Sequence, residues 1–89
     1  MLDELRQIYI GQHETIKLTE KETLLLKCVL DNWKYKCATY EEIGRYIWGN
    51  LIPEECIRKN VQTIKENLNK KLKDEFQIIV IKSRGIKIV

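Results

Sequence analysis

The sequence predicts a small α+β fold in which three helices lie between a short N-terminal β-hairpin and a C-terminal β-hairpin. Two Thr-x-x-Glu segments, starting at Thr19 and Thr39, indicate helix starts, because the hydroxyl and the carboxylate can bond the free amides of a first turn. Apolar residues recur at helical spacing from Ile57 to Leu72. After residue 75 the pattern changes to two apolar, β-branched runs separated by a turn, which predicts the C-terminal hairpin.

The length of the chain limits the number of domains. Its 89 residues have room for one hydrophobic core, so we expect a single domain over residues 1–89. A content of 44% apolar and 33% charged residues is typical of a folded globular domain. No apolar run approaches the roughly 20 residues that cross a bilayer, and the first residues lack the basic-then-apolar order of a secretory signal. We therefore expect no membrane partner and a cytoplasmic location.

Charge is distributed unevenly along the chain. Residues 1–56 contain seven Lys and Arg against ten Asp and Glu, a net charge of −3. Residues 57–89 contain nine against three, a net charge of +6, and the two parts together give the formal net charge of +3. A basic excess confined to one helix and one hairpin favours a polyanionic partner more strongly than the total charge does.

The N-terminal part is predicted to contain strands and then a helix. We expect two short strands within residues 1–18, at 8–10 and 15–18, and the residues up to Gln7 are expected to form a frayed helical turn or a truncated connection to a segment upstream. The first helix spans residues 19–32, and its apolar face contains Leu25, Cys28 and Val29. Asp31 and Asn32 are expected to end it.

A second helix is predicted over residues 39–49, after a short strand within residues 33–38. Gly49 suits the position just past a helix end, where a left-handed backbone is common. The side chains expected to point inward from this helix are Ile43, Tyr46, Ile47 and Trp48.

The third helix is predicted over residues 53–74, with Pro53 in its first turn, where the missing N–H needs no partner. Its apolar residues follow one another at steps of four, three, four and four, which places them on one side of the helix. They are Ile57, Val61, Ile64, Leu68 and Leu72. Residues 76–89 then form the hairpin, with Lys82 to Gly85 as its turn.

Three helices followed by a hairpin is the layout of a winged helix-turn-helix, in which the third helix enters the major groove of DNA. The hairpin, or wing, then reaches the backbone or the minor groove. With the apolar residues packed inward, Lys59, Gln62 and Glu66 point most directly outward. Long cations suit phosphates, polar side chains suit base edges, and a carboxylate can accept from a cytosine amino group or orient a lysine. The predicted DNA-binding residues are Arg58, Lys59, Gln62, Thr63, Lys65, Glu66, Asn69, Lys70, Lys82, Ser83 and Arg84.

A plainer interpretation of the same charges exists. Lysines on the third helix can simply keep a solvated face soluble, and cations on an edge hairpin can prevent strand pairing between molecules. Lys82, Arg84 and Lys87 favour the DNA interpretation, because they place three cations on one protruding hairpin with no acid between them.

The chain offers few residues for catalysis or metal binding. Its three cysteines are widely spaced, without a C-x-x-C pair, and the single histidine is His13. We interpret Cys28 and Cys37 as small core residues, and nothing near Cys56 in the sequence suggests a nucleophile. We therefore expect neither an enzyme nor a metal or cofactor site.

Four segments resemble the OmpR/PhoB-type effector domains of bacterial response regulators. Residues 17–26 (KLTEKETLLL) are similar to the family's "LT-x-KE-x-x-LL", and residues 39–49 (TYEEIGRYIWG) to its "S-x-E-E-L…vWG". Residues 68–72 (LNKKL) are similar to "LR-x-KL" at the end of the recognition helix, and residues 81–88 (IKSRGIKI) to "vRGvGYkl" in the wing. The resemblance extends over residues 17–89 in the expected order and implies a winged-helix DNA-binding domain.

The sequence departs from this family pattern at several positions. Asn69 replaces the arginine after the leucine, Lys82 stands where the wing arginine is usual, and Ser83 replaces a glycine. Only about two strands of sequence precede Thr19, where the family has a four-stranded sheet.

The resemblance also implies partners. It suggests RNA polymerase as a contact of the loop at residues 50–55, and two copies on repeated half-sites of double-stranded DNA. The alternative is a winged helix that serves as a protein–protein interaction module.

Overall fold

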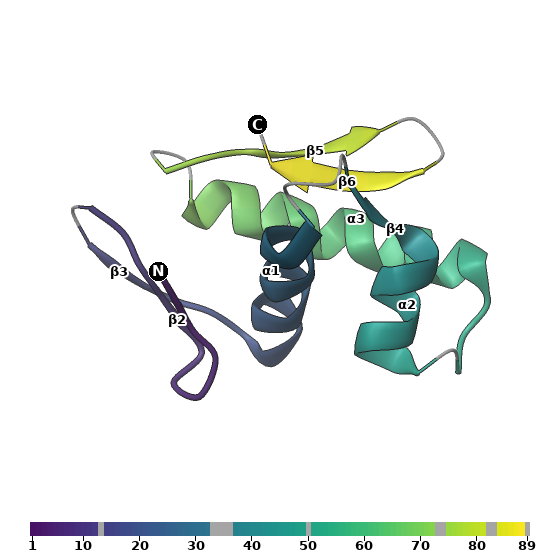
Figure 1. Ribbon diagram of the computed structural model, residues 1–89, viewed down its shortest axis with the longest axis horizontal. Helices are drawn as coiled ribbons and strands as arrows, with labels where there is room; N and C mark the ends of the chain where they lie inside the picture. Colours follow the sequence, from purple (N-terminus) through teal and green to yellow (C-terminus); the bar gives the residue numbers. More distant parts are fainter. Residues whose placement is uncertain (13, 33–36, 50, 73–74, 82–83, 89) are drawn as a thin grey trace.

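The computed structural model describes residues 1–12, 14–32, 37–49, 51–72, 75–81 and 84–88. Within them the chain has an α+β fold with three helices and two antiparallel sheets. The elements in order are β1 (Leu2–Asp3), β2 (Ile8–Ile10), β3 (Thr15–Lys17), α1 (Glu20–Asn32), β4 (Ala38–Thr39), α2 (Tyr40–Trp48), α3 (Glu54–Lys71), β5 (Ile78–Ile81) and β6 (Gly85–Ile88). In Figure 1, β5 and β6 run along α3, and β2 and β3 lie on the side of α1 opposite α2.

The N-terminal sheet has three strands in the order β1-β2-β3 rather than the predicted two. Residues Leu2–Asp3 pair with β2, so these two residues form a strand and not part of the expected helical turn. The chain can reverse there because Gln7 adopts a positive φ of 56° and the Asp3 carboxylate accepts from the backbone N–H of Arg6 at 3.1 Å.

This sheet is attached to the segment that follows α3. Tyr9 packs edge-to-face on Phe76, with 5.5 Å between the ring centroids. The backbone N–H of Gln12 donates to Glu75 Oε1 at 2.9 Å. Burial, and then the nearby Glu75 carboxylate, raise the pKa of Tyr9 above its usual value.

Helix α1 begins as predicted, since Thr19 and Glu22 form a reciprocal capping box. The Glu22 N–H donates to Thr19 Oγ1 at 3.2 Å, and the Thr19 N–H donates to Glu22 Oε1 at 2.8 Å. The helix ends at Asn32, as expected. Leu25 and Val29 face the core and are almost fully buried.

Helix α2 has the predicted caps. Thr39 accepts from the N–H of Glu42, and Gly49 takes the left-handed conformation with φ of 61°. The Glu42 carboxylate accepts from the Thr39 hydroxyl at 3.0 Å rather than from the Thr39 backbone, which belongs to β4. Tyr46 was expected to point inward, but it is 46% exposed.

Helix α3 starts one residue later than predicted, because Pro53 is its N-cap and lies outside the first turn. The Pro53 carbonyl accepts from the amides of Cys56 and Ile57. The helix ends at Lys71, and the predicted continuation through residues 73–74 lies outside the described residues. The predicted inward stripe is confirmed, since all five of its side chains are buried.

The C-terminal sheet has the order β4-β6-β5, and Val80 of β5 pairs with Ile86 of β6. Two boundaries of the predicted hairpin are wrong. Phe76 lies before β5, and Gly85 is the first residue of β6 rather than part of the turn. Gly85 lies so close to β4 that a Cβ there would overlap the backbone carbonyl of Ala38.

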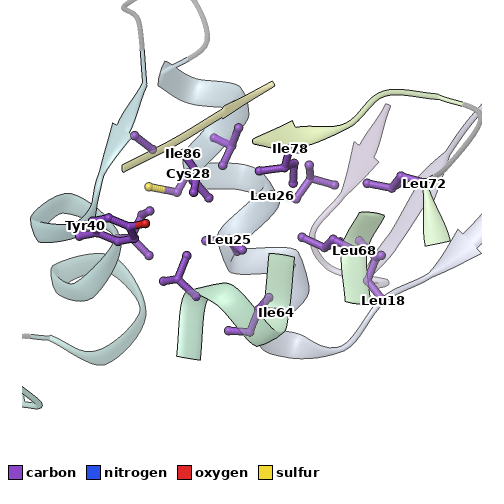
Figure 2. Packing of buried hydrophobic residues seen from close by; sticks show 14 of the residues in the cluster. Leu18, Leu25, Leu26, Cys28, Tyr40, Ile64, Leu68, Leu72, Ile78 and Ile86 are labelled. Atoms are coloured by element: carbon purple, nitrogen blue, oxygen red, sulfur yellow. The ribbon is translucent and has the colours of Figure 1, made fainter. Parts of the chain in front are cut away.

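One hydrophobic core joins these elements. Figure 2 shows residues of this cluster from several elements: Leu25 and Leu26 of α1, Leu68 of α3, and Ile78 and Ile86 of the C-terminal sheet. In the parts of the chain that the structure describes, no helix combines the length and the apolar character needed to cross a membrane.

Candidate nucleic-acid interface

Most of the predicted DNA-binding residues of α3 are exposed on the side of the helix opposite its buried stripe. The exposed ones are Arg58, Lys59, Gln62, Thr63, Glu66 and Lys70, while Lys65 and Asn69 are half-buried. Arg84 is exposed and lies in the turn directly before β6. Lys82 and Ser83 lie outside the described residues.

Tyr40 joins the N-terminal part of α3 to the C-terminal hairpin. The Arg58 guanidinium lies over the Tyr40 ring, 5.2 Å from its centroid. The Tyr40 backbone N–H donates to the Arg84 carbonyl at 3.1 Å. One buried tyrosine therefore contacts the two segments that the sequence assigns to DNA binding.

The sequence did not single out Tyr40, which stands inside a capping segment. A tyrosine directly after an N-cap gives no sign of its long-range contacts, because those contacts depend on tertiary packing.

Asn69 joins the C-terminal half of α3 to the same hairpin. Its Nδ2 donates to the Ile78 carbonyl at 2.9 Å, and the Ile78 N–H donates to its Oδ1 at 2.8 Å. The donor and the acceptor of the Asn69 amide are thus both bonded to β5. The Asn69 side chain therefore holds α3 against β5 and is not free to contact a ligand.

The centre of the exposed face carries a hydrogen-bonded pair. Gln62 Nε2 donates to Glu66 Oε1 at 3.0 Å across one helical turn. Thr63 is turned toward its own helix, with its hydroxyl 3.3 Å from the Lys59 carbonyl. Among the described residues, Glu66 has no cationic partner within ion-pair distance.

The cations around this pair differ in their partners. Arg58 is 3.6 Å from Glu54, an exposed pair that contributes little to stability. Lys59, Lys65 and Lys70 form no ion pair with any residue that the structure describes. They are therefore available to bind phosphate.

Lys71 does not belong to the exposed face of α3 that carries these cations. Its Nζ lies 2.6 Å from Glu22 Oε1 and 3.2 Å from the Lys17 carbonyl, so it attaches α3 to the start of α1. Because Glu22 is buried, this cation stabilises the fold and is withdrawn from the exposed face.

The cysteines differ in burial. Cys28 is buried, as predicted, and burial, followed by the Glu42 and Asp31 carboxylates, raises its pKa to about 11. Cys37 is only half-buried, so its predicted place in the core is wrong, and Cys56 is exposed. No cluster of His, Cys, Asp and Glu suited to a metal is found within the described ranges, which exclude His13.

The arrangement combines cations on an exposed helix, a hydrogen-bonding amide and carboxylate between them, and a neighbouring hairpin with Arg84 in its turn. Such a set can bind phosphates through its cations and base edges through its polar groups. No protein-family model matches the chain, and no curated protein matches it.

Proposed function

We propose that the chain is a winged-helix domain that binds double-stranded DNA sequence-specifically in the regulation of transcription. Helix α3 would lie in the major groove, and the β5–β6 hairpin, which we name the wing, would lie on the adjacent backbone or minor groove. The observation that carries this proposal is the contact of Tyr40 with both Arg58 and Arg84, which joins the first part of α3 to the turn of the wing.

The dimensions of α3 suit this role. Its 18 residues are roughly 27 Å long, and its exposed face is polar, as a helix in the roughly 12 Å wide major groove requires. Glu54 and Glu55 lie in the first turn of α3, and Lys70 and Lys71 lie in its last turn.

The resemblance to response-regulator effector domains supports the same proposal. It implies a bacterial, cytoplasmic protein, a homodimer on repeated half-sites, and a contact of residues 50–55 with RNA polymerase. The three-stranded N-terminal sheet is smaller than the family's four-stranded one. We therefore propose a divergent relative of that family.

Fluorescence anisotropy with a labelled duplex of mixed sequence tests DNA binding directly. A DNA-binding domain has a non-specific dissociation constant on the order of 10⁻⁴–10⁻⁶ M at physiological salt, and binds more tightly at low salt. Lys59→Ala with Lys70→Ala should weaken this binding, while Arg45→Ala, on α2 and paired with Glu41, serves as the control. Absence of binding at low salt would refute the proposal.

Besides DNA binding, we propose a protein contact for the segment between α2 and α3, and one observation favours it. Leu51, in the segment between α2 and α3, is 87% exposed, although leucine is usually buried. We propose this segment as a surface for RNA polymerase or another protein. Leu51→Asp should then abolish polymerase recruitment on a bound promoter and leave duplex affinity unchanged. Unchanged recruitment would contradict this role.

A further inference from the structure

We propose that Gln62 and Glu66 form a base-reading unit selective for exocyclic amino groups in the major groove, with cytosine N4 as the donor to Glu66. This proposal rests on DNA binding by α3. It concerns the class of base recognised and not the ability to bind a duplex.

The hydrogen bond between the two side chains fixes the direction of both. A carboxylate can only accept, so the Gln62 amide must turn its NH₂ group toward Glu66 Oε1. This leaves Gln62 Oε1 and Glu66 Oε2 without a hydrogen-bond partner among the described residues. The pair therefore presents two acceptor oxygens on the exposed face.

The surroundings of Glu66 support a base contact. Lys70 is one helical turn away, at a spacing where opposite charges commonly pair, but Glu66 bonds to Gln62 instead. Inside a groove lined by phosphates, a carboxylate loses water and is repelled, so it needs a hydrogen-bond donor to offset that loss.

The major groove limits which bases can supply that donor. Cytosine presents an N4 amino group and adenine an N6 amino group, whereas guanine O6 and N7 and thymine O4 are acceptors only. A carboxylate pairs with cytosine N4, because adenine also places the N7 acceptor beside its amino group. Gln62 retains a second N–H besides its oxygen, which is the set that matches adenine N6 and N7.

A randomised-site selection tests the proposal in three proteins: the unmodified chain, Glu66→Ala and Glu20→Gln. Glu20 is an exposed carboxylate in the first turn of α1, so its change controls for the altered net charge. The unmodified chain and Glu20→Gln should select a cytosine at one position. Glu66→Ala should lose that preference and bind mixed-sequence duplexes at least as tightly, because an acid has been removed.

A modified base then tests the single contact. N4-methylcytosine at the selected position keeps Watson–Crick pairing but places a methyl group where the groove-facing hydrogen stood. It should weaken binding by the unmodified chain by about 5- to 10-fold, the low end of the discrimination known for specific base contacts, and leave Glu66→Ala unaffected.

The outcomes separate this proposal from the one on which it rests. If Glu66→Ala selects the same sites as the unmodified chain, the pair only stabilises the helix and the inference is overturned, while DNA binding stands. Selection of guanine or thymine at the position that depends on Glu66 also overturns it. If no protein binds any duplex at low salt, both proposals fail.

Discussion

Asn69 and Ile78 form two hydrogen bonds, at 2.9 and 2.8 Å, between helix α3 and strand β5. Strand β5 is at the edge of its sheet, where backbone groups otherwise lack partners. The side-chain amide offers one donor and one acceptor, as a neighbouring strand would. Helix α3 and the proposed wing are thereby held together by one side-chain amide and the backbone of β5.

Replacing Asn69 by alanine should therefore destabilise the protein by about 2 kcal/mol, because the N–H and carbonyl of the buried Ile78 lose their partners. Urea unfolding measures this change. Asn67→Ala is the matched control, since Asn67 is exposed on the same helix, and it should change stability by less than about 0.5 kcal/mol. Equal stability of the two variants would show that water replaces the amide.

The Glu22–Lys71 pair should be strongly coupled. Glu22 is 3% exposed and bonds both the Thr19 amide and Lys71, so Lys71→Met leaves a buried carboxylate without its cation. We expect a loss of about 2 kcal/mol, below the 3–5 kcal/mol of fully buried pairs because Lys71 is partly exposed.

A double-mutant cycle with Glu22→Gln checks this coupling. The double variant should be less destabilised than the two single changes predict together. Additive changes in the free energy of unfolding would mean that the two side chains act independently.

Gly85→Ala should disrupt the attachment of the wing to β4. A Cβ at this position would overlap the backbone of Ala38, which cannot move as a flexible side chain can. We expect a loss of about 2–3 kcal/mol. Gly49→Ala provides the comparison, since Gly49 has open space around it but a φ of 61°, and should lose about 1 kcal/mol. A Gly85 variant as stable as the Gly49 variant would contradict the close approach.

The wing cations should determine part of the salt dependence of DNA binding. Lys82→Ala combined with Arg84→Ala should weaken binding to all duplexes and reduce the slope of log K against log[salt] by about one to two phosphate equivalents. Lys82 is included on the sequence pattern and Arg84 on its exposed position. Anisotropy titrations at several salt concentrations measure the slope. An unchanged slope would place the wing away from the DNA backbone.

Cys28 should make the protein less stable at alkaline pH. Its folded-state pKa of about 11 lies above the ordinary 9.0, so the contribution of the neutral thiol is complete below pH 9 and is lost as the pH rises through about 11. Between pH 8 and 10.5 the unmodified chain should lose on the order of 1 kcal/mol more than Cys28→Ala. Urea unfolding at both pH values measures this difference. The titration of Tyr9 affects both proteins equally and therefore cancels. Parallel losses would exclude the thiol as the cause.

The helix starts and the buried face of α3 were predictable because their causes are local. The bonds of Thr19 and Thr39 to residues three positions later need only one helical turn. The buried stripe from Ile57 to Leu72 follows from the helical spacing of these apolar residues in the sequence. The same period indicated which polar side chains of α3 would be exposed.

Only the tertiary structure decided which of those polar side chains remain available. Asn69 was predicted to lie on the DNA-binding face, yet it bonds Ile78. No pattern in the sequence predicted a contact for Lys71, which bonds Glu22, 49 positions away. Gly85 was predicted to lie in a turn, but it lies in strand β6. A glycine is needed there because β4 comes too close to leave room for a Cβ. Spacing along the chain determines which side of an element a residue takes. It carries no information about the distant backbone or charge that packing brings against that side.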